Sequence, residues 1–241
     1  MTTSPPLHIV VPARHEQDNL ERLHAQVRTL TGMPARLIVV LDADDDVTLP
    51  VARRIAAADP GVRVVENAWG RGGRAAVLTG FDQVAAGPVL VAMADLSDDL
   101  ALVPQMYRLY LDGAHVVCPS RWMRGGRQLG GPAVKRALSR AAGVTLSRLR
   151  GLPTHDATNN FRLYDKALLD RLDLAPEGGF ELALEITVKA FLGGARIAEL
   201  PTTWRARTAG RSKFRTWRWL PRYLRWYLWA LVHRRRPAAA R

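Results

Sequence analysis

The chain has 241 residues, 48% of them apolar, which is enough for the core of one large α/β domain or two small ones. A single cysteine, Cys118, excludes a disulfide framework and a multi-cysteine zinc site. The formal net charge of +13 would suit a nucleic-acid-binding protein, but residues 201–241 hold twelve Arg or Lys and no Asp or Glu, together with five of the seven tryptophans. A basic, Trp-rich tail is typical of contact with anionic lipid headgroups. We therefore expect a membrane surface, and no nucleic acid, as a partner.

Residues 1–6 contain no basic stretch followed by a long apolar one, so we expect no secretory signal and a cytoplasmic protein. Cys118 ends an apolar run, 114–118, and no activating base lies nearby in sequence. This setting favours a buried thiol over a nucleophile.

Five short apolar runs, rich in β-branched residues and without strong alternation, are typical of strands covered on both faces. Segments with helical periodicity separate them. Such strand–helix alternation predicts an open, mostly parallel sheet flanked by helices, with ligands at the carboxyl ends of the strands. The strands are expected at 7–12, 36–41, 62–66, 88–94 and 114–119, and the helices near 18–30, 49–58, 74–86 and 100–111.

Polar residues follow four of these strands directly, although each segment alone also fits a solvated loop. His15 and Glu16 follow the first strand, Asp42 and the acidic run 44–46 follow the second, and 70–74 (GRGGR) follows the third. Because the carboxyl ends of parallel strands share one edge of a sheet, we expect these groups to form one site. Asp42 can accept hydrogen bonds from a nucleobase or ribose, and the glycine-rich loop resembles a phosphate cradle only weakly.

Asp95 follows the fourth strand and is the best candidate for a metal ligand. Carboxylate oxygens suit Mg²⁺ or Mn²⁺, which usually keep several waters and substrate phosphates. Ser97 and Asp98 can supply further oxygens, whereas Asp99 is better read as the cap of the helix that begins near Leu100.

Beyond residue 119 the sequence predicts a Gly- and Arg-rich loop, a helix at 132–148, a helix at 180–192 and a strand near 196–200, without a flexible linker or an internal repeat. Seven short segments of the chain then stand in the order and spacing of one known set of motifs. They are Val10–Glu16 (V-P-x-x-N-E, with His15 in place of Asn), Asp42 with Asp46–Thr48, Gly70–Gly72 with Ala76 and Gly80, Asp95–Ser97, Ser120–Trp122, Asp156–Arg162, and Arg207 with Gly210, Ser212 and Lys213.

Together these segments resemble glycosyltransferase family 2, and within it the polyprenol- or dolichol-phosphate sugar synthases. The resemblance implies a GT-A-type, Rossmann-like α/β fold over 1–215, with a nucleotide-sugar half at about 7–118 and an acceptor half at 119–215. It implies inverting transfer of a sugar from a GDP- or UDP-sugar to a polyprenyl phosphate. A soluble hydroxyl acceptor remains an alternative, and a basic membrane or nucleic-acid adaptor is a non-enzymatic one. A sugar nucleotidyltransferase is disfavoured because 12–16 lacks the expected G-x-G-x-R start.

The resemblance also implies roles for single residues. Met93 stands where the family's first metal-motif Asp is usual, and a thioether is a poor ligand for a hard cation, so coordination rests on Asp95. If the acceptor is a hydroxyl, a general base is needed, with Asp156, Glu181 and Glu185 as candidates. Around the nucleotide sugar, the resemblance places Pro12, Ala13, Glu16, Asp42, Gly72, Ala94 and Asp95. At the metal it places Asp95, Ser97 and Asp98. It places Arg207 and Lys213 at donor or acceptor phosphates, Arg121 with Arg124 at the acceptor phosphate, and Asp156 in the catalytic set.

The last segment, 216–241, is too short and too charged for a convincing membrane span. At helical spacing, one stripe holds leucines and another holds arginines, which predicts an amphipathic helix lying in the membrane interface at the inner face of the cell membrane. A terminal helix packed on the body, or a partner-binding helix, is the alternative, and a homo-oligomer stays open. The apolar stripe is Leu220, Leu224, Tyr227 or Leu228, and Leu231, and the basic one is Arg218, Arg222 and Arg225.

Overall fold

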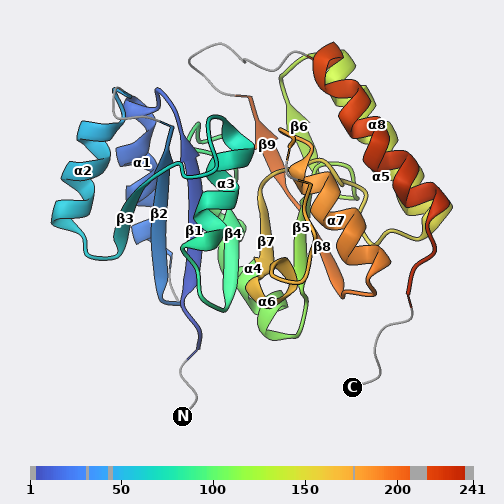
Figure 1. Ribbon diagram of the computed structural model, residues 1–241, viewed down its shortest axis with the longest axis horizontal. Coiled ribbons are helices and arrows are strands. Elements are labelled where there is room, and N and C mark those ends of the chain that lie inside the picture. Colours follow the sequence, from blue (N-terminus) through green and yellow to red (C-terminus); the bar gives the residue numbers. More distant parts are fainter. Residues whose placement is uncertain (1–3, 31–32, 43–45, 176, 207–215, 237–241) are drawn as a thin grey trace.

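A single sheet of seven strands organises the molecule (Figure 1). The computed structural model describes residues 4–30, 33–42, 46–175, 177–206 and 216–236. The strands stand in the order β3-β2-β1-β4-β7-β5-β8. They are β1 (Leu7–Ala13), β2 (Ala35–Leu41), β3 (Val62–Glu66), β4 (Pro88–Val91), β5 (Val116–Ser120), β7 (Arg162–Asp165) and β8 (Ile197–Pro201).

Most strand pairs are parallel, which confirms the expected sheet. The pairs β1–β2, β1–β4, β2–β3 and β5–β8 are parallel, whereas β7 is antiparallel to both of its neighbours, β4 and β5. The sequence did not predict β7, because its four residues include Arg162 and Asp165 and lack the apolar run of the other strands. Arg162 is nevertheless fully buried.

Helices cover both faces of the sheet and bury two apolar clusters. One face carries α1 (Gln17–Arg28), α2 (Leu49–Ala58) and α4 (Val103–Leu111), the last preceded by the short helix η1 (Leu100–Leu102). The other face carries the rest of the helices of the described chain. They are α3 (Gly73–Asp82), α5 (Ala133–Arg150), α6 (Lys166–Leu169), α7 (Leu182–Leu192) and α8 (Thr216–Val232).

Cys118 lies inside this second cluster and has no exposed surface, as the sequence predicts. Burial raises the pKa of its thiol to about 11, so the thiolate is not available at neutral pH. A small second sheet, β6 (Arg127–Leu129) with β9 (Thr203–Arg205), forms beside the main one and brings the chain after β8 back toward the loop that follows β5.

Helix α8 packs against α5 and α7 (Figure 1). Trp226 and Ala230 are buried in this contact, while Leu224 and Leu228 point outward and are each 48% exposed. The helix is therefore both a terminal helix docked on the body and a carrier of exposed apolar side chains. None of the described helices is long and apolar enough to cross a membrane.

Candidate functional site

The carboxylate of Asp42 joins three of the four predicted strand ends. Its Oδ1 accepts hydrogen bonds from Asn67 Nδ2, at 2.9 Å, and from the backbone N–H of Gly72, at 3.0 Å. Arg14, from the loop after β1, lies 3.8 Å from its Oδ2. Because β1 lies between β2 and β4 in a parallel arrangement, the segment after β4 ends at the same edge. We call this edge, with Asp42, Gly72, Asp95 and Asp98, the strand-end site.

The glycine-rich loop turns into α3 through backbone conformations that favour glycine. Gly70 and Gly72 have φ of 99° and 108°, although a Cβ at either would meet no atom within 4 Å. Conformation, and not space, thus requires glycine here. Of the two arginines in this loop, Arg71 is exposed, whereas Arg74 turns inward, where its Nη1 lies 2.9 Å from Glu185 Oε2. Only Arg71 remains free to meet an anion.

The loop after β1 is tied to the loop after β2 by Asp46, which is buried. Asp46 accepts hydrogen bonds from the N–H of His15, at 3.1 Å, and from the N–H of Thr48, at 2.8 Å. Burial alone would raise the pKa of Asp46, but the hydrogen bonds from Thr48 and His15 outweigh it and lower that pKa. His15 itself has φ of 58°. Asn and His adopt this left-handed conformation more readily than most residues, which explains why His can replace the usual Asn of the motif.

The residues predicted as metal ligands lie in a tight loop beyond β4. This strand ends at Val91, three residues earlier than predicted, because Asp98 Oδ2 accepts the N–H of Met93 at 2.8 Å and closes the loop. Asp95 Oδ1 accepts the N–H of Ser97 at 3.1 Å. Burial, together with the charge of Asp95, raises the pKa of Asp98 to about 7. The prediction that Asp99 caps the next helix is confirmed, since its Oδ1 accepts the N–H of Ala101.

Arg121 and Asp156, both expected in the catalytic set, form a buried pair. Arg121 Nε and Nη2 donate to Asp156 Oδ2 and Oδ1, at 2.6 and 2.9 Å. Its guanidinium also donates to the side chains of Gln128, Ser139 and Thr158. Most of its polar hydrogens are engaged in this way, and its expected place at the acceptor phosphate stays a prediction.

Asp156 has no exposed surface. Burial would raise the pKa of its carboxyl, but the charge and hydrogen bonds of Arg121 lower it. A carboxylate that is held ionised and fully paired is a poor general base, so we assign Asp156 to orienting Arg121.

The other candidate bases are buried as well. Glu185 accepts hydrogen bonds from Arg74, from Lys189 Nζ at 2.9 Å and from the N–H of Ala175 at 2.7 Å. Its carboxylate therefore holds α3, α7 and the segment before α7 together. Glu181 is 2% exposed; its Oε1 accepts the N–H of Gly179, and its Oε2 has no hydrogen-bond partner. Neither glutamate therefore belongs to an exposed polar stripe.

The remaining predicted residues fall into three groups. Pro12 and Ala13 belong to β1, and Glu16 is the residue before α1, so all three lie at the strand-end site as expected. Ala94 and Ser97 are buried inside the loop after Met93, and Arg124 is exposed. Arg207 and Lys213, with Asp44, Asp45, Gly210 and Ser212, lie outside the described residues.

A divalent cation would find two carboxylates, Asp95 and Asp98, in the loop after β4. No cluster of three or more His, Cys, Asp or Glu side chains suited to a metal occurs among the residues that the structure describes. Asp95 and Asp98 lie close enough for the charge of one to raise the pKa of the other, and a cation between them would relieve that repulsion. These residues fit Mg²⁺ or Mn²⁺ only if water and substrate phosphates complete the coordination.

Comparison with known proteins identifies the family of this chain. Residues 8–173 match the model of glycosyl transferase family 2, and the chain belongs to that family. It is 27% identical to a dolichol-phosphate mannosyltransferase of Pyrococcus furiosus, over 86% of this chain and 58% of the relative, so it spans less than two thirds of that protein. It is 28% identical to a polyprenol monophosphomannose synthase of Mycolicibacterium smegmatis, over 85% of this chain and 79% of the relative. The chain is a glycosyltransferase.

A solved structure shows the same GT-A-type fold. Glucosyl-3-phosphoglycerate synthase of Mycobacterium tuberculosis, in complex with Mn²⁺, UDP-glucose and phosphoglyceric acid, superposes with a TM-score of 0.70. The two chains are 19% identical, and the match covers 94% of this chain and 79% of that one. At this identity the likeness establishes the fold alone.

Proposed function

We propose that this family 2 enzyme transfers a sugar from a nucleotide-sugar donor to a polyprenyl phosphate. The observation that carries the proposal is the strand-end site, where Asp42, the start of α3 and the Asp95–Asp98 loop lie at one edge of the sheet. Curated relatives over most of the chain support the acceptor class, since they are named as polyprenol- or dolichol-phosphate mannosyltransferases.

The donor would bind across this edge. Asp42 would face the nucleoside, and the first N–H groups of α3, which have no partner within the helix, would face the diphosphate. Asp95 and Asp98 would hold Mg²⁺ or Mn²⁺, and that ion would neutralise charge on the leaving nucleoside diphosphate. Asp46 keeps the loops after β1 and β2 together around this donor.

The acceptor phosphate would attack the anomeric carbon with one of its oxygens. The bond from that carbon to the nucleoside diphosphate breaks, the nucleoside diphosphate leaves, and the sugar is joined to the acceptor phosphate with inverted configuration. A phosphate monoester is already ionised at neutral pH, so the site has to position it and does not have to deprotonate it. Asp156 and Glu185 both accept hydrogen bonds from arginine side chains, so neither carboxylate is free to act as a base. This supports a phosphate acceptor, which needs no base.

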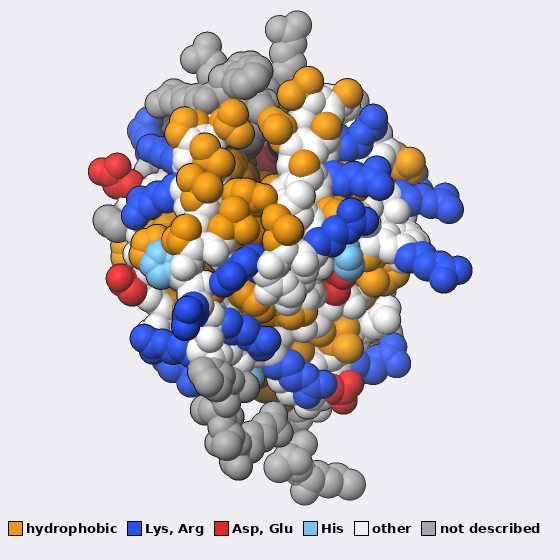
Figure 2. All heavy atoms as spheres, turned by 90° about the vertical axis from the view of Figure 1, so that its right-hand side faces the viewer, with side chains coloured by type: hydrophobic (Ala, Val, Ile, Leu, Met, Phe, Trp, Pro, Cys, Tyr) orange, Lys and Arg blue, Asp and Glu red, His pale blue; other side chains and the backbone are white. Residues whose placement is uncertain are grey.

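The proposed lipid acceptor calls for contact with a membrane, and one face of the protein suits it. Figure 2 shows hydrophobic side chains gathered on the face formed by α5 and α8, with Lys and Arg around them. The exposed large hydrophobic side chains of these two helices include Leu224 and Leu228 of α8 and Val134 and Leu138 of α5. We propose that this face lies on the inner surface of the cell membrane, with α5 contributing as well as the C-terminal helix.

The test is sugar transfer with the full chain, vesicles that contain a polyprenyl phosphate, and radiolabelled GDP- or UDP-sugars with Mn²⁺. We expect label in the organic-extractable lipid with one of the donors. Label transferred only to a soluble hydroxyl compound would overturn the acceptor class. If neither GDP-sugars nor UDP-sugars raise the Tm, with or without Mn²⁺, the proposal of a nucleotide-sugar donor is contradicted.

A further inference from the structure

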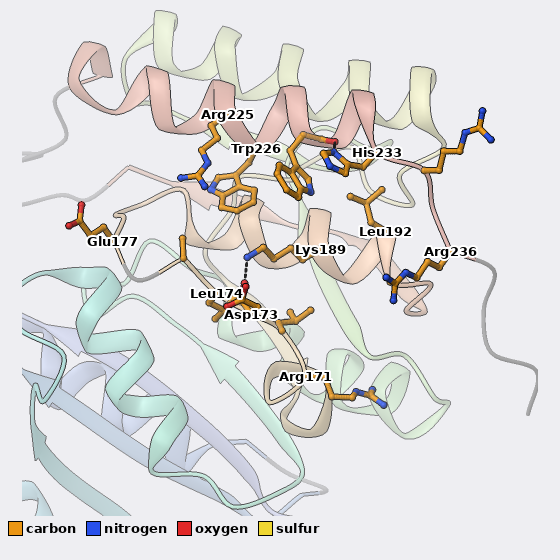
Figure 3. A pocket seen from close by; sticks show the side chains of 15 residues that line it. Arg171, Asp173, Leu174, Glu177, Lys189, Leu192, Arg225, Trp226, His233 and Arg236 are labelled. Atoms are coloured by element: carbon orange, nitrogen blue, oxygen red, sulfur yellow. Dashed lines mark hydrogen bonds between the residues drawn. The ribbon is translucent and has the colours of Figure 1, made fainter.

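A groove of about 770 Å³ lies between α7, α8 and residues 171–175 with Glu177, outside the strand-end site (Figure 3). Apolar and aromatic side chains form its floor, among them Leu174, Leu192, Trp226 and Trp229. None of its lining residues belongs to the strand-end site or to the Arg121–Asp156 pair. The groove is therefore a separate feature that the proposed transfer reaction does not use.

Unpaired arginines surround this floor. Arg171, Arg225, Arg234 and Arg236 line the groove, and none of them forms an ion pair with another described residue. Figure 3 shows Arg225 toward one end of the groove and Arg171 and Arg236 toward the other. An anion at either end would thus find a guanidinium group without displacing a carboxylate.

Lys189 is the exception among these cations. It donates hydrogen bonds to Glu185, whose carboxylate Arg74 also contacts, and to the carbonyl oxygen of Asp173, so its ammonium group is already engaged. Asp173 and Glu177 are the only acidic side chains that line the groove within the described chain. Five Arg or Lys side chains line the groove against these two acidic ones, so its net charge is positive.

The aromatic rings are held in place by one another. The ring centroids of Trp226 and Trp229 are 5.9 Å apart, and Trp229 stacks on His233 at 3.8 Å. The Arg225 guanidinium lies 5.0 Å from the centre of the Trp226 ring. A fixed apolar floor beside guanidinium groups suits an amphiphilic ligand that carries a negative charge.

The groove also adjoins the exposed apolar face of α8. Leu224 and Leu228 are four residues apart and point outward, and Arg225 and Trp229 each follow one residue later. On a helix this places Arg225 and Trp229 on the strip next to the leucines. A ligand whose charged end lay in the groove could extend its chain past Trp229 to the surface that we place against the membrane.

We propose that this groove binds an anionic phospholipid of the bilayer, with the headgroup phosphate at the arginines and the start of an acyl chain on Trp229, which is 38% exposed. The lipid is a structural ligand that fixes α8 against the membrane, and it is distinct from the acceptor. The proposal rests on the membrane contact proposed above, but not on the identity of donor or acceptor, so it is tested without sugar transfer.

The experiment measures thermal stabilisation of the full chain by dihexanoyl phosphatidylglycerol below its critical micelle concentration. We expect a rise in Tm with this lipid, and none with dihexanoyl phosphatidylcholine or with glycerol 3-phosphate. The variant Trp229→Ala and the double variant Arg225→Glu/Arg236→Glu should each weaken lipid binding by about tenfold or more. For the double variant the reason is that each Lys or Arg near an anionic lipid surface contributes to the binding free energy. The matched control is Arg22→Glu/Arg63→Glu, which changes the net charge equally on α1 and β3 and should bind as the native chain does.

A second pair of variants separates the groove from the membrane face. Leu224→Glu/Leu228→Glu should abolish sedimentation with phosphatidylglycerol vesicles and keep the response to the short-chain lipid. Equal stabilisation by both short-chain lipids, or an unchanged response in the groove variants while their circular dichroism stays native, would overturn the proposal. Stabilisation by an acidic peptide but not by the lipid would also overturn it and would indicate a protein partner.

Discussion

Arg74 Nη1 and Glu185 Oε2 lie 2.9 Å apart, and their side chains are only 5% and 0% exposed. This pair connects the first turn of α3, at the strand-end site, to α7. Lys189, one turn further along α7, also contacts Glu185 and lies 4.7 Å from the centre of the Trp226 ring. A continuous set of contacts thus runs from the loop proposed to hold the diphosphate to α8.

Breaking this pair should destabilise the protein strongly. Glu185→Gln leaves the Arg74 guanidinium buried beside a neutral partner, and we expect a loss of about 3–5 kcal/mol in the free energy of unfolding, measured by urea denaturation. The matched control is Glu21→Gln, which removes an exposed pair with Arg54 and should cost less than about 1 kcal/mol. Similar losses in both variants would show that burial does not set the strength of the Arg74 pair.

The Arg121–Asp156 pair makes a prediction about pH. The native pKa of Asp156 is lowered, so its contribution to stability is present above the ordinary aspartate pKa of about 3.9 and is lost as pH falls through the native value. Asp156→Asn should therefore be much less stable than the native chain at pH 7, and the gap should narrow below about pH 4. Thermal unfolding of both chains from pH 3 to pH 7 measures it, and a constant gap would contradict the assignment.

Asp95 and Met93 should differ sharply in their effect on transfer. Asp95→Ala removes a carboxylate that we propose as a metal ligand and should lower kcat by at least about 100-fold. Met93→Ala should lower it by less than about threefold, because a thioether adds little to a hard cation. Steady-state kinetics at several Mn²⁺ concentrations, with thermal unfolding as a check on folding, compares them. Equal losses would give Met93 a role in catalysis that its chemistry does not explain.

His15 tests the backbone at the end of β1. His15→Val places a β-branched residue at a φ of 58° and should destabilise the chain by about 1–2 kcal/mol. His15→Asn restores the usual residue of the motif and should be at least as stable as the native chain. Urea denaturation of the two variants is the measurement. If valine is tolerated as well as asparagine, the conformation does not explain the residue.

The pattern of apolar runs was enough to predict the parallel strands and the edge at which polar groups gather. The hydrogen-bond partners of those groups could not be predicted from the sequence, because they come from distant segments of the chain. Asp42 accepts a hydrogen bond from Gly72, and Arg74 donates one to Glu185. The burial of individual carboxylates could not be predicted from the sequence either. Asp156 and Glu185 have the residue type of a catalytic base, but only their surroundings show that each is held by a cation.

The positions of left-handed backbone could not be predicted from the sequence in general, although one residue type gave an indication. The exchange of Asn for His at position 15 occurs among residues that tolerate left-handed backbone, and the structure has φ of 58° there. Leu96 has the same φ, and nothing in its residue type predicted it. The tight loop between Met93 and Asp98 imposes it.

The antiparallel strand β7 has a consequence for how the chain is made. It inserts between β4 and β5, with Arg162 opposite Val91 and Tyr164 opposite Val116, so the edges of β4 and β5 that face β7 stay unpaired until residue 165 has been synthesised. A chain emerging from the ribosome would expose two unpaired strand edges for much of its translation, the period when aggregation is most probable. Truncation just before β7 should therefore yield an insoluble fragment and not an isolated nucleotide-binding half.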